Sequence, residues 1–332
     1  MRIATFNLES FGDNRFDRDR LAPRIAVFRP HLLDLNADIL CLQEVNAQKK
    51  PGQRVRCFAA LDALLEQTPY ASFHRAHSTR PGESIPADRH NLIILSRYPI
   101  LERRVLHSTH VHPPHWQMRH GHPAPETVQP VLFDRPLLYA KLDAGLAKPL
   151  HVFCVHLRAP IAAPIPGGKV SAFVWRSAEA WAEGYFLASL KHTAQSLDLR
   201  LAIDTIFSED PQALILAAGD FNAGGETNAL RLVRAPVEDT GNPELASREL
   251  LQLDARIPRQ ERQTVIHDGR GQTLDHILAS RALEAHVRSI RIFNAGLADE
   301  VRDAGSIAET GSFHAAVEAE FDFAPRSNPR SG

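Results

Sequence analysis

Asp220 and Asn222 are the two residues whose types and spacing point most directly to chemistry. They end an apolar run within residues 213–223 (ALILAAGDFNA), and Gly219 stands directly before them. This pattern predicts a buried strand that stops at a sharp turn. Residues two apart in an extended chain point the same way, so a carboxylate and an amide should lie side by side. The carboxylate can deprotonate water or bind a metal, and the amide can hold a polarised oxygen.

Polar side chains also close other apolar stretches. The further residues in such positions are Asn7, Glu44, His156, Asp275 and His314. Burying an unpaired polar group within a strand costs about a few kcal/mol, so we expect these ends to line one rim and converge on a pocket. Each residue alone has an ordinary structural explanation, such as a turn aspartate or a core histidine. Together they suit a divalent metal ion, which prefers oxygen ligands, and a phosphate, whose oxygens an imidazolium can stabilise.

The elements that must position these residues are short strands with a few helices between them. Strands are predicted over 3–8, 37–45, 91–96, 100–107, 137–142, 150–157, 213–220, 264–267, 274–279, 287–293 and 313–321. Helices are predicted over 18–36, broken near Pro30, and over 58–66, 171–207 and 227–232. Apolar residues occupy both faces of 150–157, which predicts a strand that is covered on both sides. The pattern predicts an α/β fold with two packed mixed β-sheets flanked by helices, a four-layer sandwich.

Composition narrows the class of protein. The 332 residues carry a formal net charge of −1, so no overall basic field favours non-specific nucleic-acid binding. We expect a single domain over residues 1–324 and a polar tail over 325–332 (PRSNPRSG).

The chain opens without a charged-then-apolar leader and has no apolar stretch long enough to span a membrane, so a cytoplasmic location is expected. The three cysteines are widely spaced and match neither a disulfide framework nor a zinc pattern.

An ordered set of short motifs connects these residues to a known family. The motifs are Thr5-Phe6-Asn7, LQEV over 42–45, NLIILSRYP over 91–99, Val155-His156-Leu157, GDFN over 219–222, Leu274-Asp275 and Ser312-Phe313-His314. In this order the set resembles the endonuclease/exonuclease/phosphatase superfamily, which includes DNase I-like and exonuclease III-like enzymes. The resemblance spans nearly the whole chain, and LQEV and GDFN together are fairly specific. It implies the DNase I-like four-layer sandwich and a metal-dependent phosphodiesterase, which could be a nuclease.

The resemblance also implies a role for each motif residue. Glu44 looks like the main metal-binding carboxylate, with Asn7 beside it and Glu9 as a supporting ligand. His156 looks like the group that stabilises the transition state or protonates the leaving oxygen. Asp220 looks like the group that orients or deprotonates the attacking water, Asn222 would bind a phosphate oxygen, and Asp275 would hold His314 against the scissile phosphate. The implied cofactor is Mg²⁺ or Mn²⁺, and the implied reaction is in-line attack of water on a phosphate ester.

One departure from the family pattern leaves a second hypothesis open. The family usually carries Ser-Asp-His where this chain has Ser312-Phe313-His314, so a carboxylate that serves the metal in many members is missing. A non-catalytic member that acts as a binding module is therefore the alternative. Arg135 could bind phosphate bidentately or could equally be a surface charge that precedes a strand.

Loops are expected to select the substrate. The segments 158–169 and 107–122, the latter with six histidines, are the expected specificity elements, and the histidine spacing matches no metal pattern. Trp175 and Trp181, both within the predicted helix, favour packing over base stacking. The near-neutral charge favours a small phosphoester or a short nucleic acid as the partner. The absence of a leader and of an apolar membrane-docking stretch disfavours secreted nuclease or lipase-like action.

Overall fold

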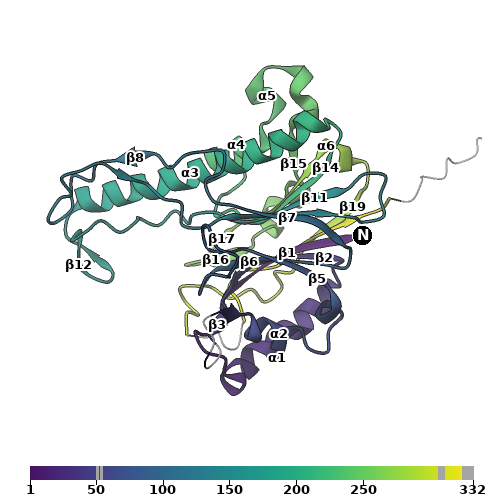
Figure 1. Cartoon of the computed structure of the whole chain (residues 1–332), viewed down its shortest axis with the longest axis horizontal. Coiled ribbons are helices and arrows are strands. Elements are labelled where there is room, and N and C mark those ends of the chain that lie inside the picture. Colours follow the sequence, from purple (N-terminus) through teal and green to yellow (C-terminus); the bar gives the residue numbers. More distant parts are fainter. Residues whose placement is uncertain (50–51, 53–54, 306–310, 324–332) are drawn as a thin grey trace, which may run out of the picture.

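Two β-sheets packed face to face form the centre of the molecule, with helices on both outer sides (Figure 1). The computed structural model describes residues 1–49, 52, 55–305 and 311–323. The α/β four-layer sandwich predicted from the sequence is confirmed. The predicted polar tail, 325–332, lies outside the described residues. None of the helices in the described part of the chain is both long and apolar enough to cross a membrane.

The first sheet has the strand order β19-β20-β1-β2-β6-β5. Its strands are β1 (Arg2–Phe11), β2 (Ile39–Val45), β5 (His74–His77), β6 (Asn91–Ser96), β19 (Val287–Ile292) and β20 (Val317–Phe321). The strands β1 and β2 pair in parallel, and the other neighbours in this sheet pair antiparallel. The parallel pair brings the ends of β1 and β2 to the same edge of the sheet.

The second sheet has the strand order β15-β18-β14-β11-β10-β7. Its strands are β7 (Ile100–Leu106), β10 (Leu137–Leu142), β11 (Leu150–His156), β14 (Leu214–Asp220), β15 (Leu250–Gln252) and β18 (Asp275–Ser280). Here β11 and β14 form the parallel pair, so their carboxyl ends also meet at one edge. Both sheets are therefore mixed, as the sequence predicts.

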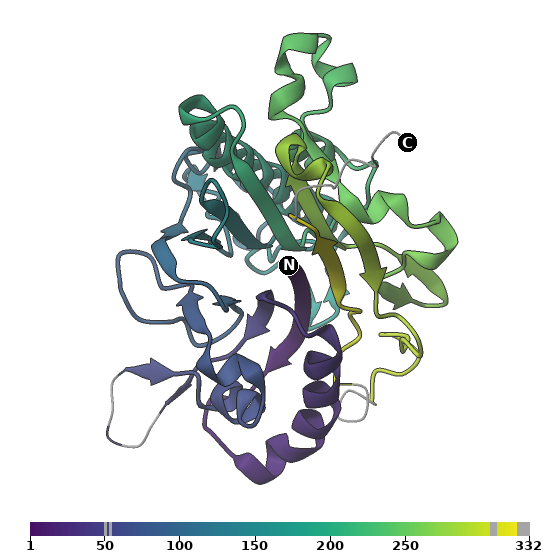
Figure 2. The same ribbon diagram turned by 90° about the vertical axis from the view of Figure 1, so that its right-hand side faces the viewer.

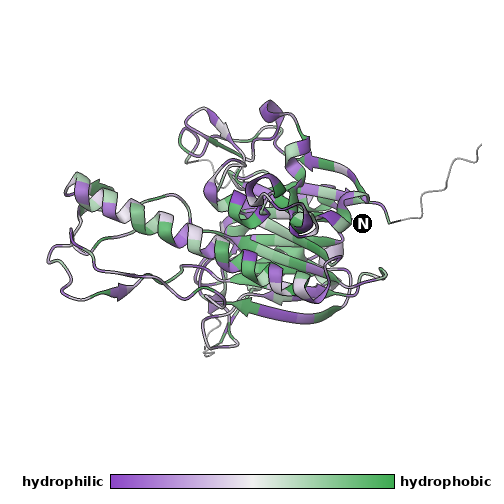
Figure 3. Cartoon of the chain, turned by 90° about the horizontal axis from the view of Figure 1, so that it is seen from above, coloured by the Kyte–Doolittle hydropathy of each residue, from purple (hydrophilic) through white to green (hydrophobic). Residues whose placement is uncertain are grey.

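Alternating side chains build three apolar layers. In β2, Ile39 and Cys41 point between the two sheets, whereas Leu40 and Leu42 belong to the layer beneath the helices α1 (Arg18–Leu35) and α2 (Ala59–Leu65). A third layer lies between the second sheet and the helices α3 (Ala178–Glu209) and α4 (Asn228–Arg234). Figure 2 shows α1 and α2 on one side of the sheets and α3 on the opposite side, and Figure 3 shows the strands as the hydrophobic centre. Burial on both faces explains the near-continuous apolar strands.

Three predicted boundaries are wrong for local reasons. The helix α1 runs through Pro30, because its stripe of buried side chains packs against the first sheet and outweighs the lost backbone hydrogen bond. The helix α3 begins at Ala178, where Ser177 caps it by accepting a hydrogen bond from the Ala180 N–H, so Trp175 is not helical. The last strand begins at Val317, and the residues before it form a loop that reaches the other sheet edge.

The remaining elements are short and lie at the periphery. They are β3 (Gln48–Lys49), β4 (Arg56–Cys57), β8 (His115–Trp116), β9 (Gln129–Pro130), β12 (Lys169–Ser171), β13 (Val174–Trp175), β16 (Val265–His267), β17 (Arg270–Gln272), α5 (Val237–Thr240), α6 (Arg281–Glu284), η1 (Pro69–Ser72), η2 (Pro243–Arg248), η3 (Leu253–Arg256) and η4 (Arg259–Glu261). The sequence did not indicate most of them, because they are too short for a periodic pattern.

An arm extends from the sandwich along the first half of α3 (Figure 1). The histidine-rich segment 107–122 is fastened to this helix by two buried carboxylates. Asp198 accepts hydrogen bonds from the backbone N–H groups of residues 109–111, and Glu183 accepts them from the Trp116 indole and the backbone of residues 119 and 120. These two carboxylates therefore hold the segment in a defined position against α3.

Candidate active site

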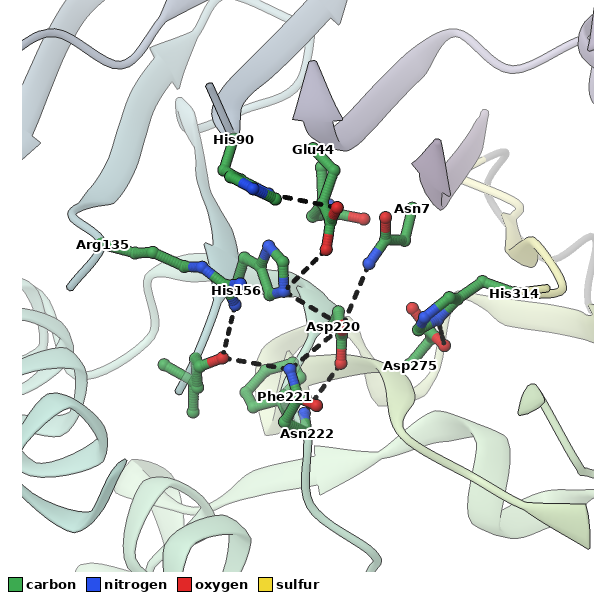
Figure 4. A network of polar contacts seen from close by, with 12 residues as sticks. Asn7, Glu44, His90, Arg135, His156, Asp220, Phe221, Asn222, Asp275 and His314 are labelled. Atoms are coloured by element: carbon green, nitrogen blue, oxygen red, sulfur yellow. Dashed lines mark hydrogen bonds and ion pairs between the residues drawn. The ribbon is translucent and has the colours of Figure 1, made fainter. Parts of the chain in front are cut away.

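Strand register aligns three of the site residues in a row. His156 on β11 lies opposite Asp220 on β14, and Asp220 lies opposite Asp275 on β18. Asn7 approaches this row from the other sheet, where β1 changes register between Asn7 and Phe11. The two sheets thus meet at one edge with their polar strand ends together (Figure 4).

Asp220 is the centre of the hydrogen-bond network. Its Oδ1 accepts the Asn222 backbone N–H at 2.8 Å, and its Oδ2 lies 3.1 Å from the amide nitrogens of both Asn7 and Asn222 and 3.3 Å from His156 Nε2. Burial acts to raise the pKa of Asp220, but His156 and His314 outweigh it, so the pKa is well below its usual range. The buried Asp220 carboxylate is therefore ionised, and its contacts are with other residues of the site.

The turn that carries Asp220 requires the glycine before it. A Cβ at position 219 would lie 2.0 Å from the Val155 carbonyl oxygen, and Gly219 has a φ of 152°. Glycine therefore lets β14 approach β11 closely enough for Asp220 and His156 to pair. Asn222 follows with a left-handed φ of 49°, which asparagine tolerates better than most residues. Its amide also donates to the Leu157 carbonyl, so it braces Asp220 from the far side.

His156 connects the two halves of the site. Its Nε2 lies 3.3 Å from Asp220 Oδ2 and 3.6 Å from Glu44 Oε1, and the side chain is buried. Among the described residues, no hydrogen-bond partner satisfies its buried Nδ1. Burial lowers the pKa of His156, and the Arg135 guanidinium lowers it further against the pull of the two carboxylates. The ring is therefore a neutral group with an unused nitrogen in a polar pocket.

Glu44 closes β2 on the opposite wall. It has a left-handed φ of 58°, and its Oε2 accepts the Ser10 backbone N–H at 3.0 Å. The His90 Nδ1 lies 3.1 Å from the same oxygen. Burial acts to raise the pKa of Glu44, but His90, His156 and Arg135 together lower it to about 2. This carboxylate is therefore ionised, as a metal ligand has to be.

Glu9 lies beside Asn7 because β1 is irregular at this point. Glu9 and Ser10 both have left-handed φ values, 48° and 53°, and the Glu9 N–H donates to Asn7 Oδ1 at 2.9 Å. Non-glycine residues in this region are strained and persist where surrounding contacts hold them. Arg24 supplies such contacts, since its Nη2 donates to the carbonyls of Leu8 and Glu9.

Phe313 fills the position of the missing family carboxylate. Its side chain is buried, and its backbone N–H donates to Glu9 Oε2 at 2.8 Å. Burial raises the pKa of Glu9, which the Phe313 N–H and His314 oppose. The Ser312 hydroxyl donates to the Asn7 carbonyl at 2.8 Å, so this last motif is joined to β1 by two hydrogen bonds. The substituted motif therefore still places Glu9 beside Asn7.

Asp275 and His314 form a buried pair. The His314 Nδ1 lies 2.9 Å from Asp275 Oδ2, and the Thr264 hydroxyl accepts the backbone N–H groups of Leu274 and Asp275. Burial disfavours the imidazolium, yet Asp275 and Asp220 raise the pKa of His314 to about 10. His314 is therefore a fixed cation beside the Asp220 carboxylate, with ligand atoms of Asp220, Asp275 and His314 all within 4.8 Å of one another.

Arg135 lies in the site and not on the outer surface. Its Nη1 donates to the Leu157 carbonyl at 3.0 Å, and its charge acts on both Glu44 and Asp220. Burial lowers the pKa of this guanidinium, though the two carboxylates oppose the shift. Of the two interpretations left open by the sequence, the geometry favours an anion-binding arginine.

Some residues of the network carry no sequence signal. His90 contacts Glu44, and His192 on α3 has its Nε2 2.9 Å from the Phe221 carbonyl, which steadies the loop after Asp220. Neither residue belongs to a motif, and His192 is one polar position in a long helix. Their contacts depend on loop conformation and helix placement, which only the folded chain specifies.

The oxygen donors on the first-sheet side fit a hard divalent cation. Glu44 is ionised, Asn7 offers an amide oxygen and Glu9 a second carboxylate, which are the ligand types that Mg²⁺ and Mn²⁺ accept. His156, His314 and the Arg135 guanidinium lie on the side of the Asp220 and Asp275 carboxylates, whereas the His90 imidazole contacts Glu44. The side with Glu44, Asn7 and Glu9 could hold a metal ion and is called here the cation-binding wall; the side with His156, His314 and Arg135 could hold a phosphate and is called the anion-binding wall.

Comparison with known proteins identifies the family and the fold of this chain. Residues 4–306 match the model of the Endonuclease/Exonuclease/phosphatase family. An endonuclease/exonuclease/phosphatase family protein from Leptotrichia buccalis has a similar structure, with a TM-score of 0.54 and 15% identity, covering 97% of this chain and 100% of that chain. An AP endonuclease from Archaeoglobus fulgidus gives a TM-score of 0.53 and 17% identity, covering 97% and 99%.

A humanized Danio rerio TDP2 gives a TM-score of 0.55 and 14% identity, covering 97% of this chain and 98% of that chain. None of the curated proteins compared with this chain matches it. At these identities the structural neighbours establish the fold alone, whereas the family model spans nearly the whole chain. The chain therefore belongs to the endonuclease/exonuclease/phosphatase family.

Proposed function

We propose that this chain is a metal-dependent hydrolase that cleaves phosphodiesters by in-line attack of water. The observation that carries the proposal is the row of His156, Asp220 and Asp275 on adjacent strands, facing Asn7 and Glu44 on the other sheet. Membership of the family supports the same reaction class.

In this proposal the cation-binding wall holds Mg²⁺ or Mn²⁺ through Glu44, with Asn7 and Glu9 beside it. A bound divalent ion supplies charge neutralisation at the phosphate. On the other wall, Arg135 and the His314 imidazolium bind phosphate oxygens, because both carry positive charge at neutral pH. These fixed charges also favour the more negative transition state over the ground state.

Asp220 and His156 are proposed to handle the protons. The Asp220 carboxylate accepts a hydrogen bond from the attacking water and orients it, with Asn222 bracing the carboxylate. His156 is neutral at rest, and its N–H donates to a phosphate oxygen or to the leaving oxygen.

The proposal is tested by hydrolysis of bis-p-nitrophenyl phosphate with Mg²⁺ and with Mn²⁺. We expect Glu44→Ala and His156→Ala each to lower kcat/KM by about 10²-fold to 10³-fold. The matched control is His151→Ala on the same strand, since His151 contacts Tyr139 and not the site. Absence of metal-dependent turnover above these variants would refute the enzyme proposal and favour the non-catalytic binding module suggested by Phe313.

A further inference from the structure

A two-stranded hairpin on the arm holds an apolar tip in water. The strands β12 and β13 pair through Lys169 and Trp175, and the tip between them carries Phe173. Phe173 is 94% exposed, and Val170 and Val174 are 59% and 52% exposed. A phenylalanine this exposed does not gain the free energy that burial of its side chain in a core would provide. The sequence pattern alone did not reveal this apolar surface.

The hairpin is held firmly at its base. The backbone N–H and the Nε of Arg176 donate to the carbonyls of Gly168 and Gly167, both at 2.9 Å. Trp175 packs over Gly184 of α3, where a Cβ would lie 2.9 Å from the indole ring. A small separate core supports this contact, formed by Val131, Ala163, Ile165, Leu187 and Ala188. A small core on the arm, separate from the main core, therefore fixes the position of the apolar tip.

The charged residues of the hairpin and of the segment leading to it are all basic, and the nearest acidic residue along the chain is the exposed Glu179 in the first turn of α3. The segment 158–176 contains Arg158, Lys169 and Arg176 and no Asp or Glu. Arg158 pairs with Asp134, whereas Lys169 lies over the Trp175 ring and donates to the Ala172 carbonyl, and Arg176 makes no ion pair among the described residues. An apolar tip with a cationic and aromatic base complements an anionic bilayer, where the tip enters the acyl region and the base meets the headgroups.

The hairpin lies on the arm, which extends past the end of the sheets that carries the candidate site (Figure 1). The chain leaves β11 at His156 and enters the segment 158–176 two residues later. The first half of α3 and this hairpin extend beyond the end of the sheets that carries the site (Figures 1 and 3). A surface that receives the tip would therefore lie at the same end of the molecule as the site.

We infer that the hairpin 169–176 docks the chain on an anionic lipid bilayer and that the phosphodiester it cleaves belongs to a lipid headgroup. The substrate part of this inference rests on the proposed function, and the docking part does not. Single-stranded nucleic acid fits the tip less well, because two of its three exposed apolar side chains, Val170 and Val174, have no aromatic face for a base to stack on.

Docking is tested by co-sedimentation of the full chain with phosphatidylcholine vesicles, with and without phosphatidylserine. We expect binding that requires phosphatidylserine and weakens with salt. Phe173→Ala should lower the vesicle partition coefficient by at least about tenfold, the loss expected when a buried aromatic side chain is removed. Leu101→Ala is the matched control, since Leu101 is 56% exposed on β7, in the sheet and not on the arm.

Charge reversal separates the two contributions to docking. Lys169→Glu with Arg176→Glu should abolish binding to phosphatidylserine vesicles, and Trp175 fluorescence should shift to shorter wavelength only when the unaltered chain binds. No vesicle binding, equal binding by Phe173→Ala, or an effect of Phe173→Ala confined to a single-stranded oligodeoxynucleotide would overturn the docking inference.

The substrate is tested with vesicles that carry a phosphodiester lipid. We expect Phe173→Ala to slow release of the headgroup at least about tenfold while hydrolysis of soluble bis-p-nitrophenyl phosphate is unchanged. Vesicle binding without hydrolysis of either substrate would overturn the proposed function and leave docking standing. Hydrolysis of the soluble ester without vesicle binding would overturn docking and leave the proposed function standing.

Discussion

The buried pair of Asp275 and His314 should make the stability of this protein depend on pH in a defined direction. The pKa of His314 is raised from 6.5 to about 10 in the folded chain. A raised pKa means that the folded state binds the proton more tightly than the unfolded state. The proton on His314 therefore contributes its full stabilisation near pH 6.5, where Asp275 is ionised, and this contribution is lost as the pH rises toward about 10.

The magnitude follows from the shift. Each pKa unit corresponds to about 1.4 kcal/mol, so the shift limits the contribution to roughly 5 kcal/mol. The His314 side chain is 13% exposed and Asp275 is fully buried, so solvent screens the pair little. Asp275→Asn removes the anion while His314 stays buried, and we expect it to cost about 3–5 kcal/mol near neutral pH.

The assay is urea unfolding followed by circular dichroism at several pH values between 6.5 and 10, for the unaltered chain and for Asp275→Asn. The free energy of unfolding should fall with pH more steeply for the unaltered chain than for the variant, and the pKa of His314 measured by NMR should drop by about 1–3 units in the variant. Asp239→Asn is the control, because Asp239 pairs with Arg231 at an exposed site. Parallel pH profiles for the unaltered chain and Asp275→Asn would refute the assigned charge state.

Three further outcomes follow from single contacts. Gly219→Ala should lower the free energy of unfolding by about 3 kcal/mol or more, measured by urea unfolding, because its Cβ would meet the Val155 carbonyl at 2.0 Å; a change below about 1 kcal/mol would contradict the close approach. Arg135→Ala should raise KM for bis-p-nitrophenyl phosphate at least about tenfold, with Arg135→Lys intermediate, because the guanidinium is part of the anion-binding wall; an unchanged KM would mean that it only supports the Leu157 loop. Asp198→Ala should speed amide hydrogen exchange at residues 109–111 and leave the sheets protected, because three backbone N–H groups lose their acceptor; unchanged exchange there would show that packing alone holds the segment.

Much of the architecture could be predicted from local sequence patterns. Apolar runs identified the central strands, since burial on both faces leaves a continuous signal. The errors occurred where a local rule competed with packing or capping: Pro30 does not end α1, and Ser177 starts α3 later than apolar spacing suggests. The short peripheral strands were missed because two or three residues cannot show a period.

The sequence by itself determined which chemical groups end the strands. In the motifs around Asn7, Glu44 and Asp220, an apolar strand pattern is followed directly by the polar side chain. The tertiary structure alone decided how these groups pair. The contacts of His156 with Glu44 and Asp220, and of the Phe313 N–H with Glu9, join residues far apart in the chain. They depend on strand register, on left-handed turns and on how the two sheets approach each other. None of these features produces a periodic pattern in the sequence. For the same reason, the exposure of Phe173 could be seen only in the folded chain, where its hairpin packs on α3.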